Sequence, residues 1–266
     1  MNMLVFPQLA TGAAALYPLR RRTERRTVIN TTADGSSVVY ADPDYAVRKW
    51  DLQANGLRGE EWDAVEALFD AVKGPLGTFT FLEPAGNLLA KSEEFSAAEW
   101  DNDPLIGTTA GIDDPFGGTR ATRVLNSSSA LAGVKQNLPV PGTFQYAMSV
   151  WARAVGAAGV TLAAMTAGGS GSVDFALSST WRRVSAPVDL SQATESVTFA
   201  ALLGPGDSVD LFGMQVEAQP AASAYQKTGA RGGVHSHARF ASTVSSVRAH
   251  GTDVYDALIQ IVSRES

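Results

Sequence analysis

Six short segments between residues 145 and 218 constrain the fold of this chain more than any other feature of its sequence. Each reads as a β-strand, and turn residues separate it from the next. The segments are 145–154, 159–167, 172–178, 181–190, 195–203 and 208–218. Short strands that follow one another at regular spacing predict a β-sandwich for this part of the chain.

The segments before residue 86 predict a different, mixed unit. Asp34-Gly35 lies between two β-branched runs, so we expect a hairpin over residues 25–42. The period-two alternation of 46–53 predicts a further strand, and TFTFLEP at 78–84 predicts another. The region therefore supplies several strands to one sheet.

One amphipathic helix is predicted over residues 59–74. Its apolar residues recur at helical spacing, its first turn is acidic, and a lysine and a glycine follow its last turn. The apolar residues are Trp62, Val65, Leu68, Phe69 and Val72.

The last 35 or so residues predict that the first unit is discontinuous. They contain two strand-like runs across His250-Gly251, which cannot bury a core alone. We therefore expect residues 1–85 and 231–266 to form one domain, with residues 86–230 inserted as a β-sandwich. The fold class is mainly β, with one helix.

Charge and cysteine content narrow the function. The net charge is −6, and residues 86–230 carry 8 Lys+Arg against 13 Asp+Glu, which argues against a nucleic-acid partner. With no cysteine, disulfides and thiolate sites are excluded. One basic run remains. It is either a phosphate or nucleic-acid site or, as we favour, a charged strand edge or a subunit contact. It consists of Arg20, Arg21, Arg22, Arg25 and Arg26.

The first residues lack the pattern of a signal peptide, because the charges follow the apolar stretch and Pro7 interrupts it. No apolar run reaches the roughly 18 residues that a membrane span needs. We therefore expect a protein made in the cytoplasm and used in a soluble assembly, with no membrane span.

The outer segments resemble phage tail proteins of the distal-tail or minor-tail type, from siphophage-like tails and gene transfer agents. The resemblance lies in the order KWDLQANGL, EEWDAVEALFDAVKG, GTFTFLEP, RFAST and the terminal SRES. It implies a structural protein of the virion tail, made in the host cytoplasm. It also implies a homo-oligomeric ring in the distal tail or baseplate, in contact with tail tube and hub proteins.

The inserted segment resembles the jelly-roll carbohydrate-binding modules often embedded in phage tail proteins. Five motifs carry this resemblance in order: NLLAKSEEFSAAEW, DDPFGGTRATRV, VKQNLPVPGTFQYAMSVWARA, STWRRVSAPVDL and VDLFGMQVEAQPAASAYQKT. The resemblance implies an outward module for host attachment, with a host-surface polysaccharide as partner.

Strand parity selects candidate sugar-binding residues. In QYAMSVWARA, one alternate set of side chains reads as core, so Trp151 and Arg153 lie on the other face. The resemblance makes that face the ligand-binding one, and Gln136 on the preceding strand would join it. The alternative is that a loop covers Trp151 and that Arg153 is an ordinary exposed side chain. Trp181 we interpret as a packing residue.

The sequence offers two candidate metal sites. The resemblance suggests a structural calcium ion, for which Asp114 and Asp210 are the candidate ligands, although each also fits a turn or a strand surface. His235 and His237 alternate in a way that could hold a metal, but a linker explains them equally well. No other cofactor is expected.

The sequence predicts no enzyme. It contains no nucleophile elbow, phosphate loop or zinc-protease motif, and nothing distinguishes a carboxylate pair such as Glu93 with Asp114 from surface charge. The alternatives to a tail protein are a free carbohydrate-binding or adhesion protein, which needs an export signal, and a glycoside hydrolase, which needs a carboxylate pair in an aromatic cleft.

Overall fold

The computed structural model describes residues 3–13, 15–16, 18–84 and 86–265. The chain forms two compact units, each built from separate segments. The sandwich unit is centred on Leu82–Val234, and the helical unit combines Ala15–Phe81 with His235–Ser266. The fold class is confirmed: the described residues are mainly β, with a single helix. None of their helices is long and apolar enough to cross a membrane.

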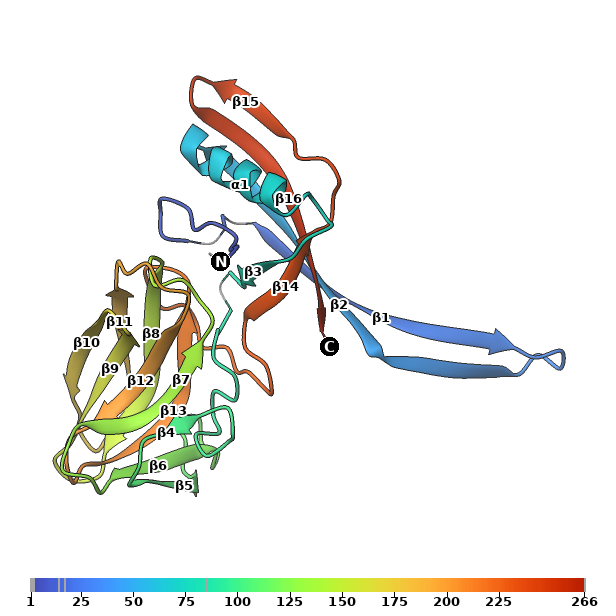
Figure 1. Ribbon diagram of the computed structural model, residues 1–266. Coiled ribbons are helices and arrows are strands. Elements are labelled where there is room, and N and C mark those ends of the chain that lie inside the picture. Colours follow the sequence, from blue (N-terminus) through green and yellow to red (C-terminus); the bar gives the residue numbers. More distant parts are fainter. Residues whose placement is uncertain (1–2, 14, 17, 85, 266) are drawn as a thin grey trace. The chain divides into compact units, whose positions relative to one another are not determined.

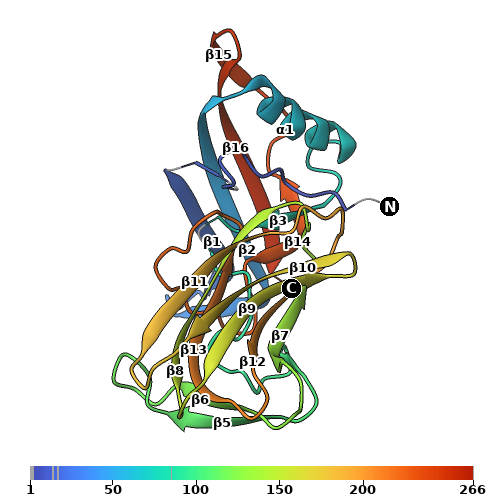
Figure 2. The ribbon, with the colours of Figure 1, turned by 90° about the vertical axis from the view of Figure 1, so that its left-hand side faces the viewer.

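In the helical unit, one antiparallel sheet has the strand order β1-β2-β16-β14-β3, with β15 paired to β16 (Figure 1). Figure 2 shows the helix α1 beside β16. The bounds are β1 Leu19–Thr31, β2 Ser37–Leu57, α1 Gly59–Ala71, β3 Phe79–Leu82, β14 Val234–Phe240, β15 Val247–Gly251 and β16 Val254–Glu265.

Aromatic side chains fill the core between this sheet and α1. Trp50 is fully buried, and its ring centroid lies 5.0 Å from that of Phe81 and 4.7 Å from that of His235. Phe240 on β14 contacts Phe79 at 4.8 Å. The helix buries Trp62, Val65 and Leu68 against it, as the helical spacing predicted. His235 is therefore part of the aromatic core.

The predicted hairpin is present and longer than expected. Thr31 pairs with Ser37 across a turn in which Gly35 has φ +82°, a left-handed conformation that favours glycine. β2 then runs without a break to Leu57, so the strands expected in 37–42 and 46–53 are one. Because β16 pairs with β2 only from Ala46 onward, the outer part of the hairpin has no third strand among the described residues.

The sandwich unit consists of two five-stranded antiparallel sheets. Their strand orders are β10-β9-β12-β7-β4 (sheet I) and β11-β8-β13-β6-β5 (sheet II), and Figure 1 shows them as two layers. The bounds are β4 Asp101–Asn102, β5 Ile106–Ile112, β6 Ala121–Asn126, β7 Ala132–Leu138, β8 Gln145–Ala154, β9 Gly159–Thr166, β10 Gly169–Ala176, β11 Arg182–Asp189, β12 Val197–Leu203 and β13 Ser208–Glu217.

Alternation along the strands separates the sandwich core from its surface. On β8, the set that parity assigned to the core is entirely buried: Tyr146, Met148, Val150 and Ala152. Trp151 and Arg153, of the opposite parity, are partly exposed on the outer face of sheet II. This face carries the candidate site.

Candidate functional site

Two rows of side chains cross the outer face of sheet II. In the first row, Trp151 pairs in register with Arg183 on β11 and with Phe212 on β13. In the second row, Asp210 on β13 pairs with Arg153 on β8 and with Arg123 on β6. Directly opposite residues project to the same side of a sheet. Rings and guanidinium groups therefore lie next to one another.

The second row is held by one buried carboxylate. Only 1% of the Asp210 side chain is exposed, and its Oδ1 accepts a hydrogen bond of 2.8 Å from Arg123 Nε. Its Oδ2 accepts from Arg153 Nε at 2.9 Å and from Arg123 Nη2 at 3.2 Å. These hydrogen bonds raise the pKa of Arg123 above its ordinary value. The partner side chains are 40% and 26% exposed, so the carboxylate fixes two guanidinium groups whose outer edges reach solvent.

Three aromatic rings border this pair of arginines. The Arg153 guanidinium stacks over Trp181, 4.9 Å from the ring centroid. Phe116, in the turn between β5 and β6, is 62% exposed and contacts Trp151 edge to face at 5.5 Å. The indole Nε1 atoms of Trp151 and Trp181 are buried without a hydrogen-bond partner. Because both nitrogen edges point inward, the exposed parts of these rings are apolar.

The other half of the face is covered by the chain that follows β13. Arg183 Nη1 donates to the Ser223 carbonyl oxygen at 2.7 Å, and Gln215 Nε2 donates to that of Ala224 at 3.3 Å. Ser149 and Gln215 are fully buried as a result. Burial also lowers the pKa of Arg183. The open part of the face therefore surrounds the buried carboxylate of Asp210. We call these residues the platform: Phe116, Arg123, Trp151, Arg153, Trp181 and Asp210.

A β-bulge in β13 separates the platform from the covered half of the face. The register of β13 against β8 shifts between Phe212 and Gln215. Gly213 lies in this bulge with φ +63°, and a Cβ atom there would come within 2.8 Å of the Tyr225 ring. Glycine is therefore required where the strand re-aims its side chains beneath the covering segment.

The structure brings Trp151 and Arg153 together but corrects the placement of Gln136. β7 belongs to sheet I, so Gln136 does not share a face with the other two. Its side chain is buried, donates to the Ala90 carbonyl oxygen at 2.7 Å and accepts from the Ala90 amide at 3.1 Å. Gln136 fixes the segment that leads into the sandwich. Parity within a strand was correct, whereas the sheet that the strand joins is set by distant residues.

Asp114, a candidate calcium ligand, organises a turn. Its Oδ1 accepts from the Phe116 amide at 2.8 Å, and its Oδ2 accepts from Arg120 Nε at 2.9 Å. Desolvation raises the pKa of Asp114, but the hydrogen bonds from Phe116, Arg120 and Gly118 outweigh it, so the pKa lies below the ordinary 3.8. The described residues contain no group of three or more acidic, histidine or cysteine side chains placed for a metal. Calcium at Asp114 or Asp210 stays a prediction, and an ion would have to displace arginines.

The other carboxylate and the arginines singled out in the sequence are not platform residues. Glu93 is buried and bonds Lys227 Nζ at 2.7 Å, Tyr225 Oη at 3.2 Å and Arg120 Nη1 at 3.4 Å. Burial raises the pKa of Tyr225. The five arginines proposed as oligomer contacts all lie exposed on β1. Their role stays a prediction.

Sequence reasoning missed three members of the platform. Phe116 and Arg123 were not singled out, and Trp181 was interpreted only as packing. An exposed ring in a glycine-rich turn is a signal that was present for Phe116. Trp181 also shares the strand parity of Arg183, two residues later.

Comparisons with known proteins give structural neighbours for about half of the chain. No family model and no curated protein sequence matches the chain. Among solved structures, the enzymatically active domain of bacteriophage CBA120 tailspike protein 4 is 11% identical with a TM-score of 0.38, covering 49% of this chain and 21% of that chain. TmCBM61, solved with beta-1,4-galactotriose, is 13% identical with a TM-score of 0.37, covering 49% of this chain and 97% of that one. The C-terminal family 22 carbohydrate binding module of Clostridium thermocellum Xyn10B is 14% identical with a TM-score of 0.42, covering 53% of this chain and 98% of that one.

Proposed function

We propose that this chain is a structural protein of a phage or phage-like tail, in the distal tail or baseplate ring, whose sandwich unit binds host-surface glycans. The platform on sheet II carries the glycan part of the proposal. Apolar ring surfaces stack on the faces of sugar rings, and fixed guanidinium groups donate hydrogen bonds to hydroxyl and carboxylate oxygens. Phe116 and Trp151 supply the ring surfaces, and Arg123 and Arg153 supply the guanidinium groups.

The charge of the platform favours acidic or hydroxyl-rich polysaccharides. Two arginines share one aspartate, so this row has an excess of one positive charge. Because Asp210 is bonded by both, neither guanidinium needs to reorganise when a ligand arrives. We therefore expect a preformed site. Because it offers few stacking rings, we expect its affinity for one sugar chain to be low, and several copies acting together would bind more tightly.

The tail role is supported by the long hairpin of β1 and β2. Its outer part carries large apolar side chains that are 41–64% exposed. They are Val28, Ile29, Val38, Val39 and Tyr40. An isolated two-stranded hairpin is marginal in water, and an exposed apolar surface of this kind marks a contact with another chain.

The surroundings of Asp114 support a binding role over hydrolysis. A general acid in a glycosidase needs a raised pKa, whereas the pKa of Asp114 is lowered. Glu93 and Asp114 both form ion pairs with Arg120, so neither side chain is free to face a bound sugar.

Replacing the central ring tests the glycan site. Ring stacking contributes about 0.5–1.5 kcal/mol, so Trp151→Ala should weaken binding of a soluble host glycan by roughly 2- to 12-fold. Leu131→Ala, which removes an exposed apolar side chain in the β6–β7 turn, is the matched control. Binding is measured on an array of host polysaccharides, followed by titration calorimetry on those that bind.

Two outcomes would contradict the proposal. If the parent protein binds none of the host polysaccharides, or if the Trp151 variant binds as well as the Leu131 control, the platform is not a glycan site. For the tail role, purified particles should contain the chain at the tail tip. Its absence from intact particles would favour a free binding protein.

A further inference from the structure

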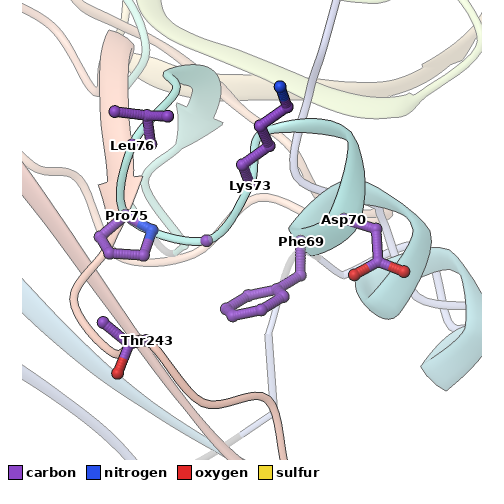
Figure 3. A pocket seen from close by; sticks show the side chains of 7 residues that line it. Phe69, Asp70, Lys73, Pro75, Leu76 and Thr243 are labelled. Atoms are coloured by element: carbon purple, nitrogen blue, oxygen red, sulfur yellow. The ribbon is translucent and has the colours of Figure 1, made fainter.

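The helical unit exposes a second apolar surface, far from the hairpin arm. It is a pocket of about 660 Å³ at the end of α1, and Figure 3 shows the side chains around it. The lining residues are Phe69, Asp70, Lys73, Gly74, Pro75, Leu76 and Thr243. Leu76 is 71% exposed, and Phe69 also borders an adjoining cavity next to Val244, which is 67% exposed. A surface of this kind fits a large apolar side chain from another chain.

The pocket is held open by the backbone that ends α1. Lys73 and Gly74 have φ +57° and +62°, and the Gly74 amide donates to the Phe69 carbonyl oxygen at 2.8 Å. The Gly77 amide donates to the Val72 carbonyl oxygen at 2.8 Å. These bonds close the helix with a fixed turn, so Pro75 and Leu76 are placed in advance.

The arm cannot reach the pocket of its own chain. β2 contains 21 residues, which at about 3.3 Å each span roughly 70 Å. α1 begins just past the far end of β2 and, with 13 residues, is only about 20 Å long. Figure 1 shows the arm running away from α1. If the arm fills such a pocket, the pocket belongs to a second copy.

Charge makes the two surfaces complementary. β1 contains five arginines and a single acid, Glu24, before the apolar part of the arm. The sequence of α1, GEEWDAVEALFDA, contains five acids and no lysine or arginine. Asp70 lines the pocket and Glu66 lies one helical turn before it, while Lys73, just past the helix, lines the pocket as well. Opposite charge on two distant surfaces of one unit favours head-to-tail association.

We propose that the arm of one copy docks on the end of α1 in the next copy, with the Val28–Tyr40 pair in the Phe69–Leu76 pocket. Val28 and Tyr40 are directly opposite in register and so share one face of the arm. Arg25, three residues before Val28 on β1, then pairs with Asp70 of the pocket lining. The inference rests on the proposed tail role and specifies how copies meet: the contact is heterologous, so it can close into a ring.

A mixing experiment with the full chain tests this contact. Tyr40→Ser removes the ring from the arm, and Leu76→Asp places a charge in the pocket; both sites are exposed. Each variant alone should self-associate at least about tenfold more weakly than the parent, as loss of an interface anchor does. An equimolar mixture should form dimers and nothing larger, because one variant keeps its pocket and the other keeps its arm. Sedimentation velocity measures this, and circular dichroism verifies folding.

Disulfide trapping gives an independent measurement, since the chain has no cysteine of its own. Tyr40→Cys mixed with Leu76→Cys should give cross-linked heterodimers under mild oxidation. Tyr40→Cys mixed with Leu131→Cys, an exposed site in the sandwich unit, is the control and should not.

A second test exchanges charges: Arg25→Asp and Asp70→Arg should each weaken association, and the double variant should restore it.

The outcomes separate this proposal from the tail role. If either single variant assembles like the parent, or if the mixture stays monomeric, the arm does not use this pocket. If the parent chain still forms oligomers in that case, the copies meet through a different contact and the proposed tail role stands. A parent chain that is monomeric at every concentration and absent from particles would overturn both.

Discussion

Removing the carboxylate of Asp210 should both destabilise the sandwich and disable its platform. Asp210→Ala deletes three charge-assisted hydrogen bonds, at 2.8, 2.9 and 3.2 Å. Such bonds contribute about 1.5–3 kcal/mol each when buried. Here the arginine partners are 40% and 26% exposed and can recover water, so the sum must be discounted. We expect a loss of about 2–3 kcal/mol in the free energy of unfolding.

For a unit of this size that loss corresponds to a fall in Tm of about 5–10 °C. Urea denaturation followed by tryptophan fluorescence measures it. Asp101→Ala is the matched control, because its side chain is 79% exposed and its nearest cation, Lys135 Nζ, is 3.9 Å away. The control should change stability by less than about 0.5 kcal/mol. If Asp210→Ala is equally mild, or if it leaves glycan binding unchanged, Asp210 does not organise the platform.

Three further outcomes are expected. The Asp34 carboxyl, which accepts hydrogen bonds from Thr32 and Ser36, should titrate with a pKa of about 2; its contribution to the turn is present above its ordinary pKa of 3.8 and is lost as the pH falls through 2, which NMR titration detects. Gly133→Ala should destabilise the sandwich by about 1–3 kcal/mol in thermal denaturation, because its Cβ would overlap the carbonyl oxygen of Ala201, whereas Gly107→Ala, with no atom nearer than 4.0 Å, should be tolerated. Excising residues 87–229 and joining the ends by a short linker should leave a folded helical unit; loss of circular dichroism and of amide protection would contradict a separable insert.

Local patterns carried most of what the sequence could predict. The alternation on β8 assigned four core residues correctly, because side chains alternate by geometry alone. The helix followed from apolar spacing, and the hairpin followed from Asp34-Gly35. By contrast, residues 37–42 and 46–53 were expected as two strands, and they are parts of the single strand β2. The register of β1 against β2 shifts between Arg25 and Thr27, where the two parts meet, and no local pattern predicts that both pair with β1.

The platform could be predicted only in part because its members come from three strands, a turn and the residue that precedes β11. Trp151 and Arg153 are on one strand, and parity alone placed them together. Joining Arg123 to them requires knowing that β13 lies between β8 and β6, which no short pattern states. The role of Asp210 follows from the same arrangement. Its single carboxylate lies between two arginines that are 87 and 57 residues away in the chain.

The proposed contact between copies bears on how tightly the platform could hold a glycan. A platform that relies on one or two stacked rings binds a single sugar chain weakly, so attachment to a cell requires several copies that act together. A head-to-tail contact through the hairpin arm would supply those copies at fixed spacing. That contact would use residues of the helical unit alone and no residue of the platform. If both proposals hold, substitutions on the platform would change the glycan bound without altering any residue of the proposed contact between copies.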